Sequence, residues 1–280
     1  MAAHDDDHDL GLPHDLGRLL SRRTALTLLG AAATAGLAGC DYLPFVGRAE
    51  AEIVGKGADG VECVVHPRET AGPFPADGSN RAHGTLANVL VDSGIVRADM
   101  RPNLDNSGAP AAGVELKFTL NLVDVSRSCA PLKDHAIYLW HCDAAGKYSI
   151  YDLPNANYLR AVGVTDAKGQ MTLTTIVPGC YMGRYPHFHF EVYPSLAKAT
   201  DYRNRLLTSQ LAIPGDVCPA VYNSVPAYKA SIAAFAKSPL ERDGIFRDNT
   251  PKQLAAQTLA MTKAPDGSYN GTVTIGLQAA

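Results

Sequence analysis

Residues 178–193, PGCYMGRYPHFHFEVY, place two histidines one residue apart directly after two tyrosines and an arginine. In a β-strand alternate side chains point to the same face, so His187 and His189 project together and Glu191 follows in the same row. Two imidazoles on one face can bind a single metal ion, and a neighbouring carboxylate would complete a site for ferrous iron. Half-exposed histidines on an amphipathic strand are the alternative interpretation, so further partners must decide.

Two tyrosines and an arginine supply such partners. Tyr181 and Arg184 lie just before the histidines, and Tyr148 follows the apolar segment 135–142 after a tight turn. Phenolate oxygens are hard donors, and two of them favour ferric over ferrous iron. An arginine beside them offers a fixed positive charge for a substrate that becomes anionic.

Neighbouring aromatic residues are expected to be structural. Tyr151 competes locally with Tyr148, and Tyr185 lies only two residues before His187, where a short tether strains simultaneous ligation. His135 and His141 share one face of segment 135–142 and are interpreted as hydrogen-bonded histidines of the sheet. Trp140 projects to the opposite face from His141 and is expected in the core.

The elements that must position these residues are mainly short strands. The chain has 280 residues, of which 46% are hydrophobic and 19% charged, with 25 glycines and 18 prolines, a mixture that favours a loop-rich β domain. Alternation and turn signals predict an all-β antiparallel sandwich with one or two short C-terminal helices. The expected strands are 114–125, 135–142, 171–177, 187–193 and 270–277, and the expected helices are 225–236 and 251–261.

The N-terminal part has the features of an export signal. Arg22 and Arg23 form a twin-arginine pair before an apolar run, and the run ends in LAGC at Cys40. We expect export by the twin-arginine route, lipid attachment at Cys40 and a periplasmic or other extracytoplasmic location. A plain membrane anchor or a fortuitous apolar tract is the alternative. The predicted organisation is a signal at 1–40, a linker at 41–60 and a catalytic domain at 61–280.

Six cysteines bear on the compartment. With Cys40 assigned to lipid, five remain, and an odd number leaves at least one free thiol. No CxxC pair occurs, so a zinc ribbon is not supported. In an oxidising compartment we expect a disulfide between Cys129 and Cys142, which bracket one predicted strand.

Five motifs resemble one known family. In order they are ETAGPF (69–74), CAPLKDHAIYLWHCDAAGKYSIYD (129–152), LRAVGVTDAKG (159–169), TTIVPGCYMGRYPHFHFEV (174–192) and LLTSQL (206–211). Each motif alone is weak, but their shared order resembles the intradiol ring-cleavage dioxygenases, which include catechol and protocatechuate dioxygenases.

The resemblance implies a non-haem Fe(III) centre with Tyr148, Tyr181, His187 and His189 as ligands, Tyr181 and His189 being axial. It also implies that Arg184 and Gln210 lie beside the substrate, and that Tyr181 leaves the metal and serves as a base. The implied reaction cleaves a catechol-type ring with O2, between its two hydroxylated carbons, to a cis,cis-muconate-type product.

Two other function classes remain open from the sequence. One is an exported β-sandwich lipoprotein that binds carbohydrate or aromatic ligands without catalysis. The other is a cupin-like Fe(II) enzyme that uses His187, His189 and Glu191. A net charge of −3 gives no reason to expect a nucleic-acid partner, and the substrate's identity and the oligomeric state are left open.

Overall fold

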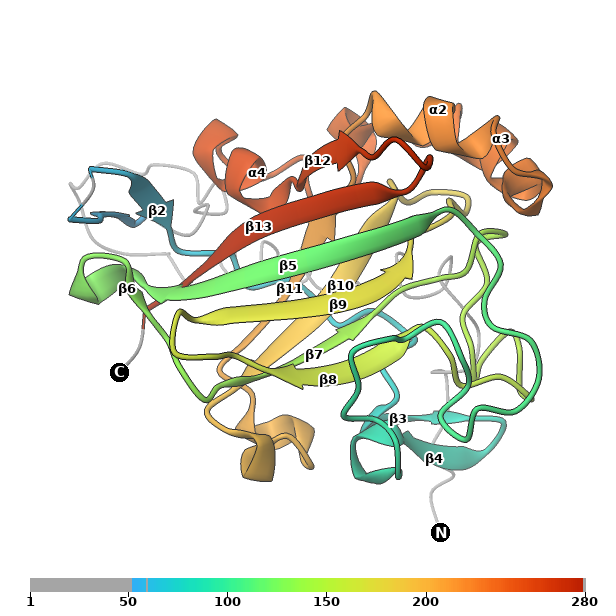
Figure 1. Ribbon diagram of the computed structural model, residues 1–280, viewed down its shortest axis with the longest axis horizontal. Coiled ribbons are helices and arrows are strands. Elements are labelled where there is room, and N and C mark those ends of the chain that lie inside the picture. The colour runs from blue at the N-terminus through green and yellow to red at the C-terminus, as the bar shows by residue number, and fades with distance from the viewer. Residues whose placement is uncertain (1–51, 59, 279–280) are drawn as a thin grey trace, which may run out of the picture.

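The computed structural model describes residues 52–58 and 60–278, so the predicted signal and Cys40 lie outside the described residues. Two sheets pack face to face (Figure 1). One sheet has the antiparallel order β11 (Leu207–Ala212), β10 (His187–Tyr193), β7 (Ala136–Trp140) and β8 (Arg160–Val164). The other contains β12 (Ala260–Lys263), β13 (Tyr269–Leu277), β5 (Glu115–Asp124), β6 (Ala130–Pro131) and β9 (Gln170–Ile176).

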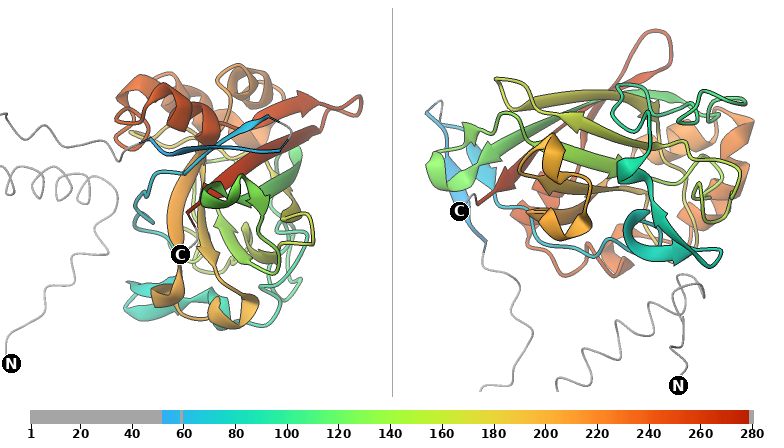
Figure 2. Two further views of the ribbon diagram at one scale, coloured as in Figure 1. Left: turned by 90° about the vertical axis from the view of Figure 1, so that its left-hand side faces the viewer. Right: turned by 90° about the horizontal axis from the view of Figure 1, so that it is seen from below.

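Smaller elements surround the sandwich. Two hairpin-like pairs are formed by β1 (Val54–Lys56) with β2 (Glu62–Val64) and by β3 (Asp77–Ala82) with β4 (Thr85–Asn88). The α-helices are α2 (Val217–Tyr222), α3 (Lys229–Phe235) and α4 (Pro251–Gln257). Short 3-10 helices are η2 (Val89–Val91), η3 (Val125–Arg127), η4 (Leu196–Lys198), η5 (Tyr202–Asn204), η6 (Pro226–Tyr228) and η7 (Leu240–Arg242). The α-helices and the β3–β4 pair lie at opposite ends of the sandwich (Figures 1 and 2).

The core between the sheets follows from strand alternation. In β5 the apolar residues Leu116, Phe118, Leu120 and Leu122 are fully buried, while the residues between them are less so. Phe118 meets Phe188 of β10 across the sandwich, with ring centroids 5.0 Å apart. Burying such apolar side chains away from water is the main driving force for folding.

Strand β10 is buried on both faces. Phe188 and Phe190 point into the core between the sheets, so His187 and His189 point to the outer face. That face is covered by a second apolar cluster, in which Tyr138 and Trp140 of β7 pack with residues from the chain between 76 and 95. The predicted metal site therefore lies on the outer face of the four-stranded sheet, in a buried layer.

The predicted all-β sandwich is confirmed, with differences in detail. β13 pairs with β5 in parallel, whereas the other pairings in the two large sheets are antiparallel. The expected helix 251–261 ends at Gln257 because Thr258 has an extended backbone, and strand β12 begins at Ala260. The expected helix 225–236 is η6 followed by α3. Strand β1 lies inside the segment 41–60 that was expected to be a linker, so folded structure begins earlier than predicted.

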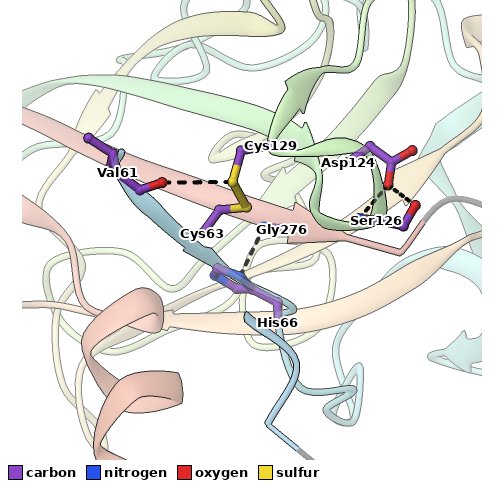
Figure 3. The surroundings of a disulfide bond; sticks show 7 residues. All are labelled: Val61, Cys63, His66, Asp124, Ser126, Cys129 and Gly276. Atoms are coloured by element: carbon purple, nitrogen blue, oxygen red, sulfur yellow. Dashed lines mark hydrogen bonds between the residues drawn. A yellow bond between two sulfur atoms is a disulfide. The ribbon is translucent and has the colours of Figure 1, made fainter. Parts of the chain in front are cut away.

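The predicted disulfide is wrong. Cys63 of β2 pairs with Cys129, next to β6, with 6.0 Å between the Cα atoms (Figure 3), and Cys142 is a buried free thiol. The five residues of β7 lie between Cys129 and Cys142. An extended strand of that length spans about 16 Å, whereas disulfide-bonded Cα atoms lie within about 7 Å of each other.

Among the helices that the structure describes, none has both the length and the apolar character needed to cross a membrane.

Candidate metal centre

Four predicted ligands converge on one point. The Tyr148 hydroxyl lies 3.1 Å from Nε2 of His189 and 3.4 Å from the Tyr181 hydroxyl. The Tyr181 hydroxyl lies 3.3 Å from Nε2 of His187, and the two Nε2 atoms are 3.0 Å apart. The two oxygens and two nitrogens thus form a closed ring, although whether they bind a metal stays a prediction.

The spacing of this ring fits a set of metal ligands. Donor atoms at about 2 Å from one ion lie about 3 Å from their neighbours. The Nδ1 atom of His187 faces the carbonyl oxygen of Tyr185, which fixes the imidazole and directs Nε2 into the ring. Across residues 52–58 and 60–278 no group of three or more His, Cys, Asp or Glu could hold a metal ion. The candidate ligand set therefore depends on the two tyrosine oxygens as well as the histidines.

Burial keeps the four side chains neutral in the absence of a cation. It lowers the pKa of His187 to about 3 and the pKa of His189 well below its usual value. It raises the pKa of Tyr181 to about 12 and the pKa of Tyr148 well above its usual value. A bound cation would therefore receive two imidazole lone pairs directly, and the phenols would release their protons on binding it.

A tight turn delivers Tyr148 to the ring. The Asp143 carboxylate accepts hydrogen bonds from the backbone N–H groups of Ala145 and Lys147, both at 2.9 Å, and Gly146 adopts a φ of +81°. The Tyr148 N–H donates to Asp152 at 2.8 Å. These local bonds fix the turn, because Asp favours such loops and Gly tolerates positive φ.

Sheet register places aromatic and amide side chains on both sides of His189. Trp140 of β7 and Gln210 of β11 are its partners across the two strand pairs. The Trp140 ring stacks on the His189 ring with centroids 5.0 Å apart and planes 6° apart. Trp140 is buried as expected, but its contact with a predicted ligand was not foreseen.

The motif ETAGPF covers the centre from the N-terminal side. Gly72 has a φ of +73°, and a Cβ atom there would lie 3.2 Å from the His189 ring. Gln210 donates from its amide to the carbonyl oxygen of Thr70 at 2.9 Å, and the Phe74 ring lies 4.9 Å from the Tyr148 ring. Glycine is favoured here because this positive φ is strained for other residues and because a Cβ atom would crowd the imidazole.

Arg184 is held beside the centre by two side chains. It donates from Nη2 to Oε1 of Gln210 and from Nε to the Asp243 carboxylate at 3.0 Å. Arg184 and Asp243 are both buried, and Arg184 interacts electrostatically with Tyr181 and Tyr148. Arg184 and Gln210, both predicted to lie beside the substrate, contact each other here, and their role toward a substrate stays a prediction.

The expected structural tyrosines and histidines lie away from the ring. Tyr151 donates to Asn80 at 2.6 Å, and Tyr185 donates to the Ile213 carbonyl oxygen at 3.0 Å. Both ring nitrogens of His141 have partners at 2.7 Å, Thr175 and the Cys142 carbonyl oxygen. His135 contacts the Lys133 carbonyl oxygen through Nδ1.

Glu191 does not join the histidines. Its carboxylate accepts hydrogen bonds from Tyr193 at 2.6 Å and Thr208 at 3.3 Å, and Arg205 lies 3.6 Å from it. Burial raises its pKa to about 8. The ligand set His187, His189 and Glu191 is therefore not assembled in this structure.

Asp243 is the main residue that sequence reasoning missed. It lies 59 positions after Arg184, in a segment outside the recognised motifs. Its carboxylate also accepts hydrogen bonds from the N–H groups of Tyr185 at 2.6 Å and Ile245 at 2.8 Å. No spacing rule could have found it, because a lone aspartate in a loop has no distinctive pattern.

Comparison with known proteins bears on the fold that holds these residues. Residues 96–189, which contain all four converging side chains, match the sequence model of the dioxygenase family. No curated protein matches the chain. An intradiol ring-cleavage dioxygenase from Tetranychus urticae is similar in structure, with a TM-score of 0.56 and 22% identity over 76% of this chain and 94% of that one. A second solved dioxygenase has a TM-score of 0.52 and 23% identity over 66% of this chain and 87% of that one. The chain thus has the fold of the intradiol ring-cleavage dioxygenases, and its resemblance to that family is confirmed.

Proposed function

We propose that this protein is a non-haem Fe(III) intradiol dioxygenase. It cleaves a catechol-type ring between the two hydroxylated carbons with O2 and gives a cis,cis-muconate-type product. The observation that carries the proposal is the closed ring of two phenol oxygens and two imidazole nitrogens, 3.0 to 3.4 Å apart, in a dioxygenase fold.

The four residues Tyr148, Tyr181, His187 and His189 would hold ferric iron, and Tyr181 would also act as a base. Ferric iron held by these residues would supply Lewis-acid chemistry toward the catechol and O2. Tyr148, His187 and His189 are at most 2% exposed, whereas Tyr181 is only partly buried. With its partly exposed side chain, Tyr181 is the residue best placed to accept a proton from a catechol hydroxyl.

Arg184 supplies positive charge where the substrate becomes anionic. Asp243 and Gln210 hold its guanidinium in place before substrate arrives, so little reorganisation is needed during the reaction. The buried surroundings keep water away and strengthen this electrostatic effect.

Export and lipid anchoring form part of the same proposal. The twin-arginine pair and the cysteine of LAGC at position 40 support translocation and attachment to a membrane surface. The Cys63–Cys129 disulfide supports an oxidising compartment, because such bonds are rare in reducing ones.

The test uses the colour and the oxygen consumption of the purified protein. Tyrosinate bound to Fe(III) absorbs visible light, so the iron-loaded protein should be red-brown and should consume O2 with a panel of catechols while a muconate-type product absorbs in the ultraviolet. Tyr148→Phe should lose both iron and colour. Tyr151→Phe, whose hydroxyl bonds to Asn80, is the matched control and should keep both. A colourless iron-loaded protein, or catechol binding without O2 uptake, would refute the proposal.

A further inference from the structure

The two turns that carry the tyrosines pack backbone against backbone. A Cβ atom at Gly179 would lie 2.4 Å from the Asp143 carbonyl oxygen, and one at Gly146 would lie 2.7 Å from the Cys180 carbonyl oxygen. The Gly179 N–H also donates to the Asp143 carbonyl oxygen at 3.1 Å. Any change in the spacing of these turns therefore moves one tyrosine relative to the other.

A single buried hydroxyl joins the two turns. Ser231 of α3 is fully buried, and its Oγ donates to the Ala144 carbonyl oxygen at 2.7 Å and accepts from the Cys180 N–H at 2.8 Å. Ala144 belongs to the turn that ends in Tyr148, and Cys180 immediately precedes Tyr181. One side chain thus bonds to both tyrosine-bearing turns.

The helical segment around Ser231 also contacts the rest of the Tyr181 loop. Tyr222 donates to the Pro178 carbonyl oxygen at 2.9 Å, and Ser238 accepts from the Gly183 N–H at 3.2 Å. This segment lies after residue 189, the last residue of the family match at 96–189. The loop is therefore braced on both sides of Tyr181 by a part of the chain that the family match does not include.

We propose that Ser231 is a positioning residue for the metal centre. Its hydroxyl sets the separation of the Tyr148 and Tyr181 oxygens, which are 3.4 Å apart. The identity of the ion rests on the proposed function, whereas the bridge between the turns does not. Residues that orient metal ligands typically contribute about 10- to 100-fold to metal affinity, and a loss in that range is expected for Ser231→Ala.

Thr165 provides a matched control at the other end of β7. Its hydroxyl donates to the Leu132 carbonyl oxygen at 2.7 Å and accepts from the His135 N–H at 3.0 Å. Thr165 is 1% exposed and Ser231 is 0% exposed, and each hydroxyl oxygen lies 3.3 Å from a second carbonyl oxygen. Thr165→Val therefore removes the same set of bonds without touching either tyrosine turn.

The experiment compares Ser231→Ala, Ser231→Cys and Thr165→Val with the full wild-type protein. Iron retention is measured by competition with a chelator, and the tyrosinate-to-iron absorption band is recorded for each loaded protein. Ser231→Ala should bind iron about 10- to 100-fold more weakly than wild type and shift the absorption band. Ser231→Cys, whose thiol forms weaker hydrogen bonds, should have an iron affinity between those of wild type and Ser231→Ala. It replaces the alanine variant if that variant does not fold. Thr165→Val should lower the melting temperature alone.

Unchanged iron retention and an unchanged band in both Ser231 variants would overturn the inference, even if their melting temperatures fall. Hydrogen exchange in metal-free protein adds a readout that needs no iron: the Cys180 amide should exchange faster in Ser231→Ala than in Thr165→Val. If wild-type protein binds iron but does not cleave catechols, the proposed function fails while the Ser231 comparison still decides this inference.

Discussion

The ion pair between Arg184 and Asp243 offers a quantitative test of how the site is held. The Nε and carboxylate atoms are 3.0 Å apart, and the side chains are 4% and 0% exposed. At an effective dielectric constant of about 20, two unit charges at this distance attract by about 5.5 kcal/mol. Removing one partner leaves the other charge buried and unpaired, which typically costs roughly 3–5 kcal/mol.

We expect Asp243→Asn to lower the free energy of unfolding of metal-free protein by roughly 3 kcal/mol at pH 7. Arg184→Gln should have a similar effect, and the double variant should lose less than the sum because neither charge is then stranded. The coupling energy from urea denaturation of the four proteins should be at least about 2 kcal/mol.

An exposed pair with the same separation serves as the control. Lys252 and Glu62 are also 3.0 Å apart, but their side chains are 50% and 55% exposed. A cycle of Lys252→Gln and Glu62→Gln should give a coupling energy below about 1 kcal/mol, because water screens exposed charges. If the buried pair couples no more strongly than this one, Asp243 does not hold Arg184 in the way argued above.

Three further outcomes are expected. Burial lowers the pKa of His66 to about 4, so below pH 6.5 the unfolded chain binds more protons than the folded one. The free energy of unfolding should therefore fall by up to roughly 3 kcal/mol between pH 6.5 and 4. Urea denaturation across that range should show a shallower fall for His66→Gln than for wild type. Reducing the Cys63–Cys129 bond, which spans 66 residues, should lower stability by about 4 kcal/mol, and thiol alkylation without reductant should leave these two cysteines unlabelled. Arg160→Lys should destabilise the protein by at least about 2 kcal/mol in the same denaturation assay. The Arg160 guanidinium donates to five protein oxygens, which a lysine ammonium cannot reach together. Equal stability of the variant and the wild type would show that those bonds contribute nothing.

Local patterns were sufficient for the part of the site that lies on one strand. Alternation in 187–193 placed His187 and His189 on one face, and β10 has that face turned toward the two tyrosines. Alternation could not place Tyr148. Its position depends on a turn that packs against the Tyr181 loop, and such packing leaves no periodic pattern in the sequence. The family resemblance supplied that residue.

Long-range contacts explain what the sequence could not predict. Ser231 and Asp243 bond to residues 51 and 59 positions away, through loops and a short helix without a repeating pattern. Five cysteines allow several pairings, and the choice of Cys63 depends on β2 lying beside β13 and on its partner β1 lying beside η3, which leads to Cys129. The expected helix 251–261 ended early because the extended backbone of Thr258 leads into pairing of β12 with β13.

The disulfide also determines how mechanical load would travel through the protein. The bond joins β2 directly to Cys129, beside the five-stranded sheet (Figure 3), before the chain reaches residues 69–74. A pull applied at Ile53 would therefore pass through the two sulfur atoms into that sheet. The loop at 69–74, which covers His189, lies beyond this bond along the chain, so the direct path of the load bypasses that loop.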